Sequence, residues 1–157
     1  MKIILHTDPD TGIVAITLPA YNDGSRDTAM TDDEMLAGVL ASIPGERNPR
    51  VAESETLLPR DLFRDAWEDS AGVLAVNMTK ARVLHLAEIR RVRNQELVKL
   101  DIPFIRAVES GDASGQSTIA TEKQVLRDIP ATFDITTGVD TPELLKARWP
   151  SELPARE

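Results

Sequence analysis

The sequence predicts an α+β protein, with a small N-terminal β-sheet lobe carrying one packed helix, followed by a C-terminal helical hairpin and a short terminal helix. Short β-prone runs separated by turn residues fill the first half, and one strong helix-start signal lies among them. Helical periodicity dominates the second half. This order of elements favours a small sheet with the helix packed across it. We therefore expect two domains, residues 1–78 and residues 79–157.

The bulk composition is ordinary for a globular protein and excludes several kinds of site. The 157 residues are 41% hydrophobic and 28% charged, and none is cysteine, which excludes disulfides, thiolate zinc sites and cysteine nucleophiles. The apolar run at residues 1–6 is too short for a signal peptide or a membrane span, so we expect cytoplasmic folding and no membrane partner. A net charge of -8 argues against a nucleic-acid partner.

The charge is distributed unevenly along the chain. Residues 1–70 hold fourteen acids and six bases, residues 80–99 hold six bases and two acids, and residues 100–157 hold ten acids and six bases. A basic helix between acidic segments is either neutralised within the fold or docks an acidic partner. Internal neutralisation is the favoured interpretation, because the acids lie close by in the sequence.

The first lobe opens with a predicted β-hairpin. Residues 3–6 and 13–18 are β-prone, and the Asp8–Gly12 run between them supplies turn geometry. The same run resembles the start of a calcium loop, but no suitably spaced glutamate closes it, so a turn is favoured. Residues 19–30 are expected to form a loop.

The rest of this lobe is predicted to contain one helix and two more strands. Thr31 and Glu34 form a capping box that starts the helix. Residues 50–58 and 73–76 are the expected strands. Between them, Phe63 and Trp67 lie four apart and are expected to share one face of a short helical turn that anchors on the core.

The second half begins with the longest predicted helix, which starts at Thr79. Its apolar stripe also contains Arg90 and Arg93. Asp101 is expected to cap a second segment, residues 102–109, that continues at an angle because proline is tolerated in a first turn. The stripe consists of Val83, Leu86, Ile89, Leu97, Leu100 and Phe104.

A turn around Gly111 and Gly115, with Asp112 or Ser114 as the next cap, leads into a returning helix that Pro130 is expected to stop. Thr141 and the following proline open a final short helix that is predicted to end at Trp149-Pro150. The buried line of the returning helix is expected at Ile119, Glu122, Leu126 and Ile129.

Arg90 and Arg93 invite two interpretations, because a charge on an apolar stripe must be paired or must reach solvent. Bidentate salt bridges to acids such as Asp101 and Asp128 would lock the hairpin, and this structural interpretation is favoured. Glu122 is a further possible partner. Alternatively, the arginines bind an acidic or carbonyl-rich surface of a partner protein. The candidate partner-binding residues are Arg90, Arg93, Arg127 and Trp149.

No constellation for catalysis, a cofactor or a metal stands out. His6 and His85 fall in different halves, on a predicted strand and a predicted helix, and no nucleophile or metal motif accompanies them. The acidic run Asp32–Glu34 is explained by the partial positive charge of a helix N-terminus. Trp67 and Trp149 are candidate interface anchors, although core packing is favoured for both. We expect a protein that is not an enzyme and that uses no cofactor.

Three separated segments resemble a known family. They are Arg90–Leu97 with Asp101, Lys123–Pro130, and Trp149-Pro150. Together they resemble the C-terminal segment of phage tail assembly proteins of the tail-fibre assembly and tail assembly chaperone type, over about residues 79–153. The chain departs from the family pattern at Asp101–Phe104, where the family has Asp-Trp, and it has a longer connection through Gly111. The N-terminal half is similar to small proteins encoded among phage tail genes.

The resemblance implies a non-enzymatic phage protein that binds other tail or tail-fibre proteins. It would either remain in the virion as a tail, baseplate or fibre component or act as an assembly factor in the host cytoplasm, and homo-oligomers are compatible with both roles. Two alternatives stay open. One is a host-directed inhibitor, which the acidic N-terminal half would suit, and the other is a carboxylate-based hydrolase, for which no carboxylate pair stands out.

Overall fold

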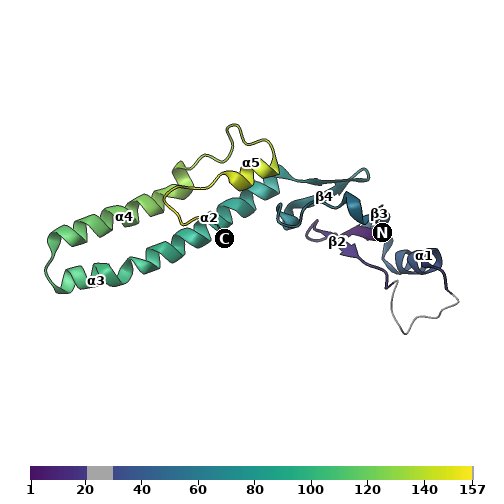
Figure 1. Ribbon diagram of the computed structural model, residues 1–157, viewed down its shortest axis with the longest axis horizontal. Helices are drawn as coiled ribbons and strands as arrows, with labels where there is room; N and C mark the ends of the chain where they lie inside the picture. The colour runs from purple at the N-terminus through teal and green to yellow at the C-terminus, as the bar shows by residue number, and fades with distance from the viewer. Residues whose placement is uncertain (21–29, 157) are drawn as a thin grey trace. The chain divides into compact units, whose positions relative to one another are not determined.

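The computed structural model describes residues 1–20 and 30–156. Two compact units, Met1–Asn77 and Met78–Glu157, divide the chain one residue before the predicted boundary. The first unit contains the strands and the second is helical, which confirms the predicted α+β class with a small N-terminal sheet lobe and a helical C-terminal part (Figure 1). Most of the expected loop at residues 19–30 lies outside the described residues.

The first unit is built around a three-stranded antiparallel sheet in the order β2-β1-β3. Strands β1 (Lys2–Thr7) and β2 (Val14–Thr17) form the predicted hairpin. Strand β3 (Arg50–Glu53) is shorter than the predicted run to residue 58. It stops there because β1 begins at Lys2, whose register partner is Glu53, and a 3-10 turn at Ser54–Thr56 follows.

The turn between β1 and β2 explains the acidic run that resembled a calcium loop. The Asp8 carboxylate accepts hydrogen bonds from the backbone N–H groups of Asp10 at 3.1 Å and Thr11 at 2.9 Å, and from the Thr11 hydroxyl at 2.9 Å. These bonds lower the pKa of Asp8. Gly12 has a φ of 66°, which glycine adopts without steric cost. The carboxylate is thus used by the turn itself, as expected.

The largest apolar cluster of this unit lies on one face of the sheet, and the fully buried Ile4 lies on the other face. Ile3 and Leu5 alternate on β1 and pack with Val14 and the fully buried Trp67. Helix α1 (Asp32–Ser42) contacts β1 and buries Leu36. Its N-terminus has the predicted capping box, with the Thr31 hydroxyl accepting from the Glu34 N–H and the Glu34 carboxylate accepting from the Thr31 N–H.

A second sheet was missed by the sequence analysis. The predicted helical turn is only a 3-10 turn at Arg64–Ala66, after which β4 (Trp67–Ser70) pairs with β5 (Val73–Val76). Ala71 and Gly72 join the strands with φ values of 51° and 84°, the pair of positive angles that a two-residue hairpin turn requires. Only β5 was predicted, because the polar β4 sequence lacks an alternating apolar pattern.

The second unit is a helical hairpin with a terminal helix, as predicted (Figure 1). Helix α2 (Met78–Lys99) runs through Leu100, which keeps a helical φ of -81°, into α3 (Asp101–Glu109). Helix α4 (Ala113–Thr132) returns along both and is capped by the predicted Asp112. Helix α5 (Pro142–Ala147) starts at the predicted Thr141 cap and packs on α2.

Several details of the second unit differ from the predictions. Leu100, and not Asp101, is the N-cap residue of α3, and α5 ends at Ala147 and not at Trp149-Pro150. The buried line of α2 is Ala81, His85 and Ile89, whereas Val83 is 63% exposed. The face is rotated because α2 packs against α5 as well as against α4. Helix α4 also continues two residues past Pro130, since proline removes only one donor and the Phe133 N–H still bonds to the Ile129 carbonyl at 2.9 Å.

Within residues 1–20 and 30–156, no helix combines the length and the apolar character needed to cross a membrane.

We expect the Trp67→Ala variant to lose about 3–5 kcal/mol of unfolding free energy, the usual cost of removing a buried aromatic side chain. Trp67 is fully buried, its indole N–H donates to the Leu62 carbonyl at 2.9 Å, and the Arg64 guanidinium lies 4.5 Å from its ring centroid. Urea denaturation followed by far-UV circular dichroism measures the change. Trp67→Phe is the matched control and should lose less, whereas a loss below about 1 kcal/mol for the alanine variant would contradict the assigned core.

Candidate interaction surface

The two arginines that were predicted to lock the hairpin have different surroundings. Arg90 is exposed, and no ion pair joins it to another described residue. Arg93 is half-buried, and its Nη1 donates to the backbone carbonyl of Arg127 in α4 at 3.3 Å. Arg93 therefore does link α2 to α4, but through a carbonyl oxygen and not through a carboxylate.

The acids predicted to pair with these arginines have other partners, which corrects the predicted salt bridges. The Asp101 carboxylate pairs with Lys123 Nζ at 2.7 Å. Asp128 accepts from the Gln124 side chain, one turn earlier on the exposed face of α4, at 2.8 Å. The position of each acid determines its partner. Asp101 is the first residue of α3 and lies against Lys123 of α4, whereas Asp128 lies one turn from Gln124 on the same helix.

Lys123 is a structural residue that the sequence analysis missed. It is only 9% exposed, and its ammonium group lies 4.8 Å from the centroid of the Phe104 ring as well as against Asp101. The buried line of α4 runs through Lys123, Leu126 and Ile129, whereas the predicted position Glu122 is exposed. The three-residue spacing between Lys123 and Leu126 indicates that both lie on the same face of the helix. A lysine is rarely buried unless it is paired, so the sequence alone did not favour burial of Lys123.

Trp149 packs within the second unit. Its indole N–H donates to the Pro154 carbonyl at 2.8 Å, and its ring lies edge-on to His85 with centroids 5.9 Å apart. The Arg156 guanidinium lies 5.1 Å from the Trp149 ring centroid. These contacts favour the packing role over the anchor role for this residue. Arg127, the remaining candidate, is exposed on α4.

The two histidines lie in different units, each engaged in a structural hydrogen bond. In the first unit, His6 Nε2 lies 3.1 Å from the Thr17 hydroxyl. In the second, His85 is buried, with Nε2 only 2.6 Å from the Arg148 carbonyl oxygen. Because a carbonyl only accepts hydrogen bonds, Nε2 carries the proton. Burial lowers the pKa of His85, so the ring is held neutral.

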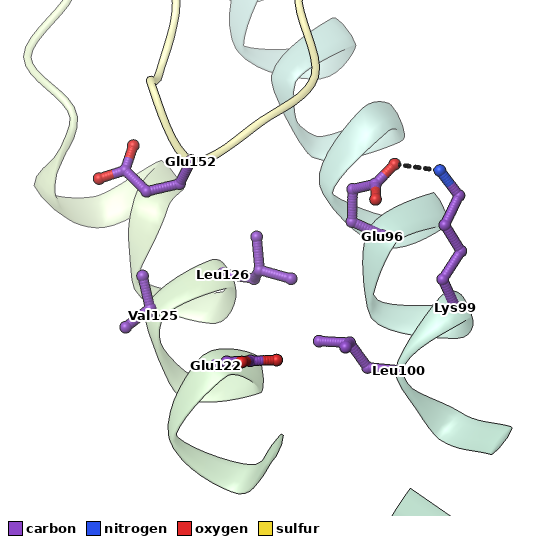
Figure 2. Close-up of a pocket in the computed structure, with 7 residues that line it drawn as sticks. All are labelled: Glu96, Lys99, Leu100, Glu122, Val125, Leu126 and Glu152. Carbon is purple, nitrogen blue, oxygen red and sulfur yellow. Dashed lines mark hydrogen bonds and ion pairs between the residues drawn. The ribbon is translucent and has the colours of Figure 1, made fainter. Parts of the chain in front are cut away.

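The second unit also contains a groove between α2 and α4 (Figure 2). It has a volume of about 320 Å³. Leu100 and Leu126 face each other across it, and Leu126 is buried while Val125 is 47% exposed. The groove is lined by Glu96, Lys99, Leu100, Glu122, Val125, Leu126 and Glu152.

The groove carries excess negative charge. Lys99 Nζ pairs with the Glu96 carboxylate at 2.6 Å, so these two charges compensate each other. Glu152 accepts a hydrogen bond from the Ser151 hydroxyl at 3.2 Å. Among residues 30–156, no cation forms an ion pair with Glu122 or Glu152. Sequence analysis did not find this site, because its residues come from three segments that meet only in the folded unit.

A row of exposed apolar side chains lies on α3. Ile102, Ile105 and Val108 are 61%, 54% and 51% exposed and recur every third residue, so they share one side of the helix. Val98, near the end of α2, is also exposed. We call Ile102, Ile105 and Val108 the α3 row. Apolar side chains that gather on one helix face are typical of a protein-docking surface.

Among the described residues, no group of three or more histidine, aspartate or glutamate side chains is arranged to hold a metal ion. Comparison with protein-family models, curated proteins and solved structures finds no match for the chain.

We expect the stability of the second unit to fall as the pH drops through about 6.5, the ordinary histidine pKa. The unfolded chain takes up a proton there, while folded His85 resists protonation because its pKa is lowered, so protons favour unfolding until the pH falls below the folded pKa. Thermal denaturation between pH 5 and 8 measures this, in a His6→Gln background where His85 is the sole histidine. His85→Gln in that background should flatten the profile. An unchanged slope would show that other groups cause it.

We also expect energetic coupling between Asp101 and Lys123. In a double-mutant cycle with Asp101→Asn and Lys123→Met, the coupling should be about 0.5–1 kcal/mol, a modest value because the aspartate side chain is 57% exposed. Urea denaturation measures each corner of the cycle. A control cycle combines Asp128→Asn with Lys123→Met. Its coupling should be near zero, because the Asp128 carboxylate accepts from Gln124 and not from Lys123. Equal coupling in the two cycles would argue against a specific pair.

Proposed function

We propose that this chain is a non-catalytic protein-interaction module of a bacteriophage tail. It acts either as a tail-associated or fibre-associated component of the virion or as a factor in tail-fibre assembly. The observation that carries the proposal is the run Leu126–Pro130 followed by Trp149-Pro150, in which the chain resembles tail-fibre assembly and tail assembly chaperone proteins.

The positions of these residues in the second unit support a scaffold role for the motif. Leu126 and Ile129 are buried on the inner face of α4, and Pro150 is fully buried in the C-terminal segment. Residues of this kind support a hairpin and leave its outer surfaces available for contacts that differ between proteins.

The α3 row supports a binding role for those outer surfaces. Burying three large aliphatic side chains against a partner removes apolar area from water, which is the main favourable contribution to most protein associations. The row lies where the chain departs from the family pattern, at Asp101–Phe104 and the residues after it. We therefore expect the row to contribute to the choice of partner.

The test is to purify virions of a phage that carries this gene and to quantify the chain by mass spectrometry. A fixed copy number per particle is the expected result for a tail or fibre component. Absence from virions together with association with a tail protein in infected-cell lysate is the expected result for an assembly factor. Absence from both would contradict the proposal and favour a host-directed inhibitor, which the acidic first seventy residues would suit.

In the same assays, Ile102→Asp combined with Ile105→Asp should weaken the association with the tail partner by at least about tenfold, as expected when central apolar contacts are lost. Val83→Asp is the matched control, because Val83 is 63% exposed and lies on α2, away from the row. Circular dichroism should show unchanged folding for both variants. Equal weakening by the control would mean that the α3 row is not the contact surface.

A further inference from the structure

We propose that the groove between α2 and α4 binds a basic-apolar peptide segment of a partner protein, in which one large apolar side chain is flanked by lysine or arginine. The inference rests on the proposed protein-interaction role and names the chemistry of the partner. It concerns a different surface from the α3 row, because the groove is lined by the end of α2, the middle of α4 and the C-terminal segment.

The size and floor of the groove suit an apolar side chain. Its volume of about 320 Å³ lies at the lower end of the range for ligand pockets, enough for one large side chain with its adjoining backbone. Leu100 and Leu126 approach from opposite helices, and Val125, 47% exposed, extends the apolar surface toward solvent (Figure 2). A partner side chain in this position would remove that surface from water.

The charge around this floor selects a basic partner. Glu122 and Glu152 lie on either side of Leu126 in the view of Figure 2, and neither forms an ion pair with a described cation. Two lysines or arginines flanking the apolar side chain would each meet a carboxylate. An acidic segment would be repelled, so the same carboxylates exclude the wrong partner as well as attracting the right one.

Two cations of the same unit, Lys123 and Arg156, are engaged elsewhere and do not neutralise Glu122 or Glu152. Lys123 is held by Asp101 and the Phe104 ring. Arg156 lies over Trp149, and its Nη1 donates to the Lys146 carbonyl at 3.2 Å. A second copy of the chain is a poorer occupant than a basic protein, because each copy carries a net charge of -8.

The experiment uses the full chain with isotope-labelled methyl groups and three short synthetic peptides as probes. One peptide contains Lys-Lys-Leu-Phe-Lys-Lys, the second replaces each lysine by glutamate, and the third replaces Leu-Phe by Ser-Ser. We expect the first peptide alone to shift the methyl resonances of Leu100, Val125 and Leu126 in a saturable manner. Equal binding of the glutamate peptide, equal binding of the serine peptide, or shifts confined to other methyl groups would overturn the proposal.

Charge variants then separate recognition from general attraction. Glu122→Gln combined with Glu152→Gln should weaken binding of the first peptide about tenfold, a size typical of losing charged contacts at an interface. Glu109→Gln combined with Glu143→Gln removes the same charge from exposed positions outside the groove and should change the affinity less than about twofold. Equal losses in the two variants would contradict a specific site.

The outcome is independent of the tail assignment. Peptide binding in the groove by a chain that is absent from virions and unassociated with tail proteins would retain this inference and remove the tail role. The reverse result would retain the tail role and remove the groove. Self-association in analytical ultracentrifugation, abolished by Val125→Asp, would assign the groove to a second copy and overturn the proposed partner.

Discussion

The hydrogen bond from buried His85 to the Arg148 carbonyl is the interaction on which the second unit most depends. It attaches the C-terminal segment to α2, with the Trp149 ring edge-on to the imidazole. That attachment helps to position Glu152 at the edge of the groove. Burial penalises the charged form of this ring and lowers its pKa, which favours the neutral imidazole as the donor. Part of the candidate partner site is therefore supplied by a segment that this hydrogen bond holds against α2.

Several arginines of the second unit donate to backbone carbonyl oxygens, whereas Arg91 pairs with the Glu88 carboxylate. Arg82 donates to Val139, Arg93 to Arg127, and the Nε of Arg148 to Asp134. Such bonds satisfy carbonyls near helix ends and in the connecting segment, where no regular secondary structure supplies donors. The consequence concerns charge. Because these three arginines bond to carbonyls, they do not pair with acids, and no described cation forms an ion pair with Glu122, which favours a basic partner.

The first unit is held together by a different pairing. Arg50 on β3 makes a bidentate bridge to Asp69 on β4, with Nε to Oδ2 at 2.6 Å and Nη2 to Oδ1 at 2.8 Å. The Asp69 side chain is only 7% exposed, so removing Arg50 would leave a nearly buried charge without its partner. This bridge connects the three-stranded sheet to the two-stranded sheet, while Trp67 contributes apolar packing to the same core.

The sequence by itself determined the elements whose signals are local. The Asp8–Gly12 turn, the Thr31 capping box and the Asp112 and Thr141 caps were predictable because each signal lies within a few residues. Only the tertiary structure decided which face of α2 is buried, which partner Asp101 takes, and that Glu122 and Glu152 line one groove. The physical reason is that these features depend on contacts between segments far apart in the chain, which no local pattern encodes.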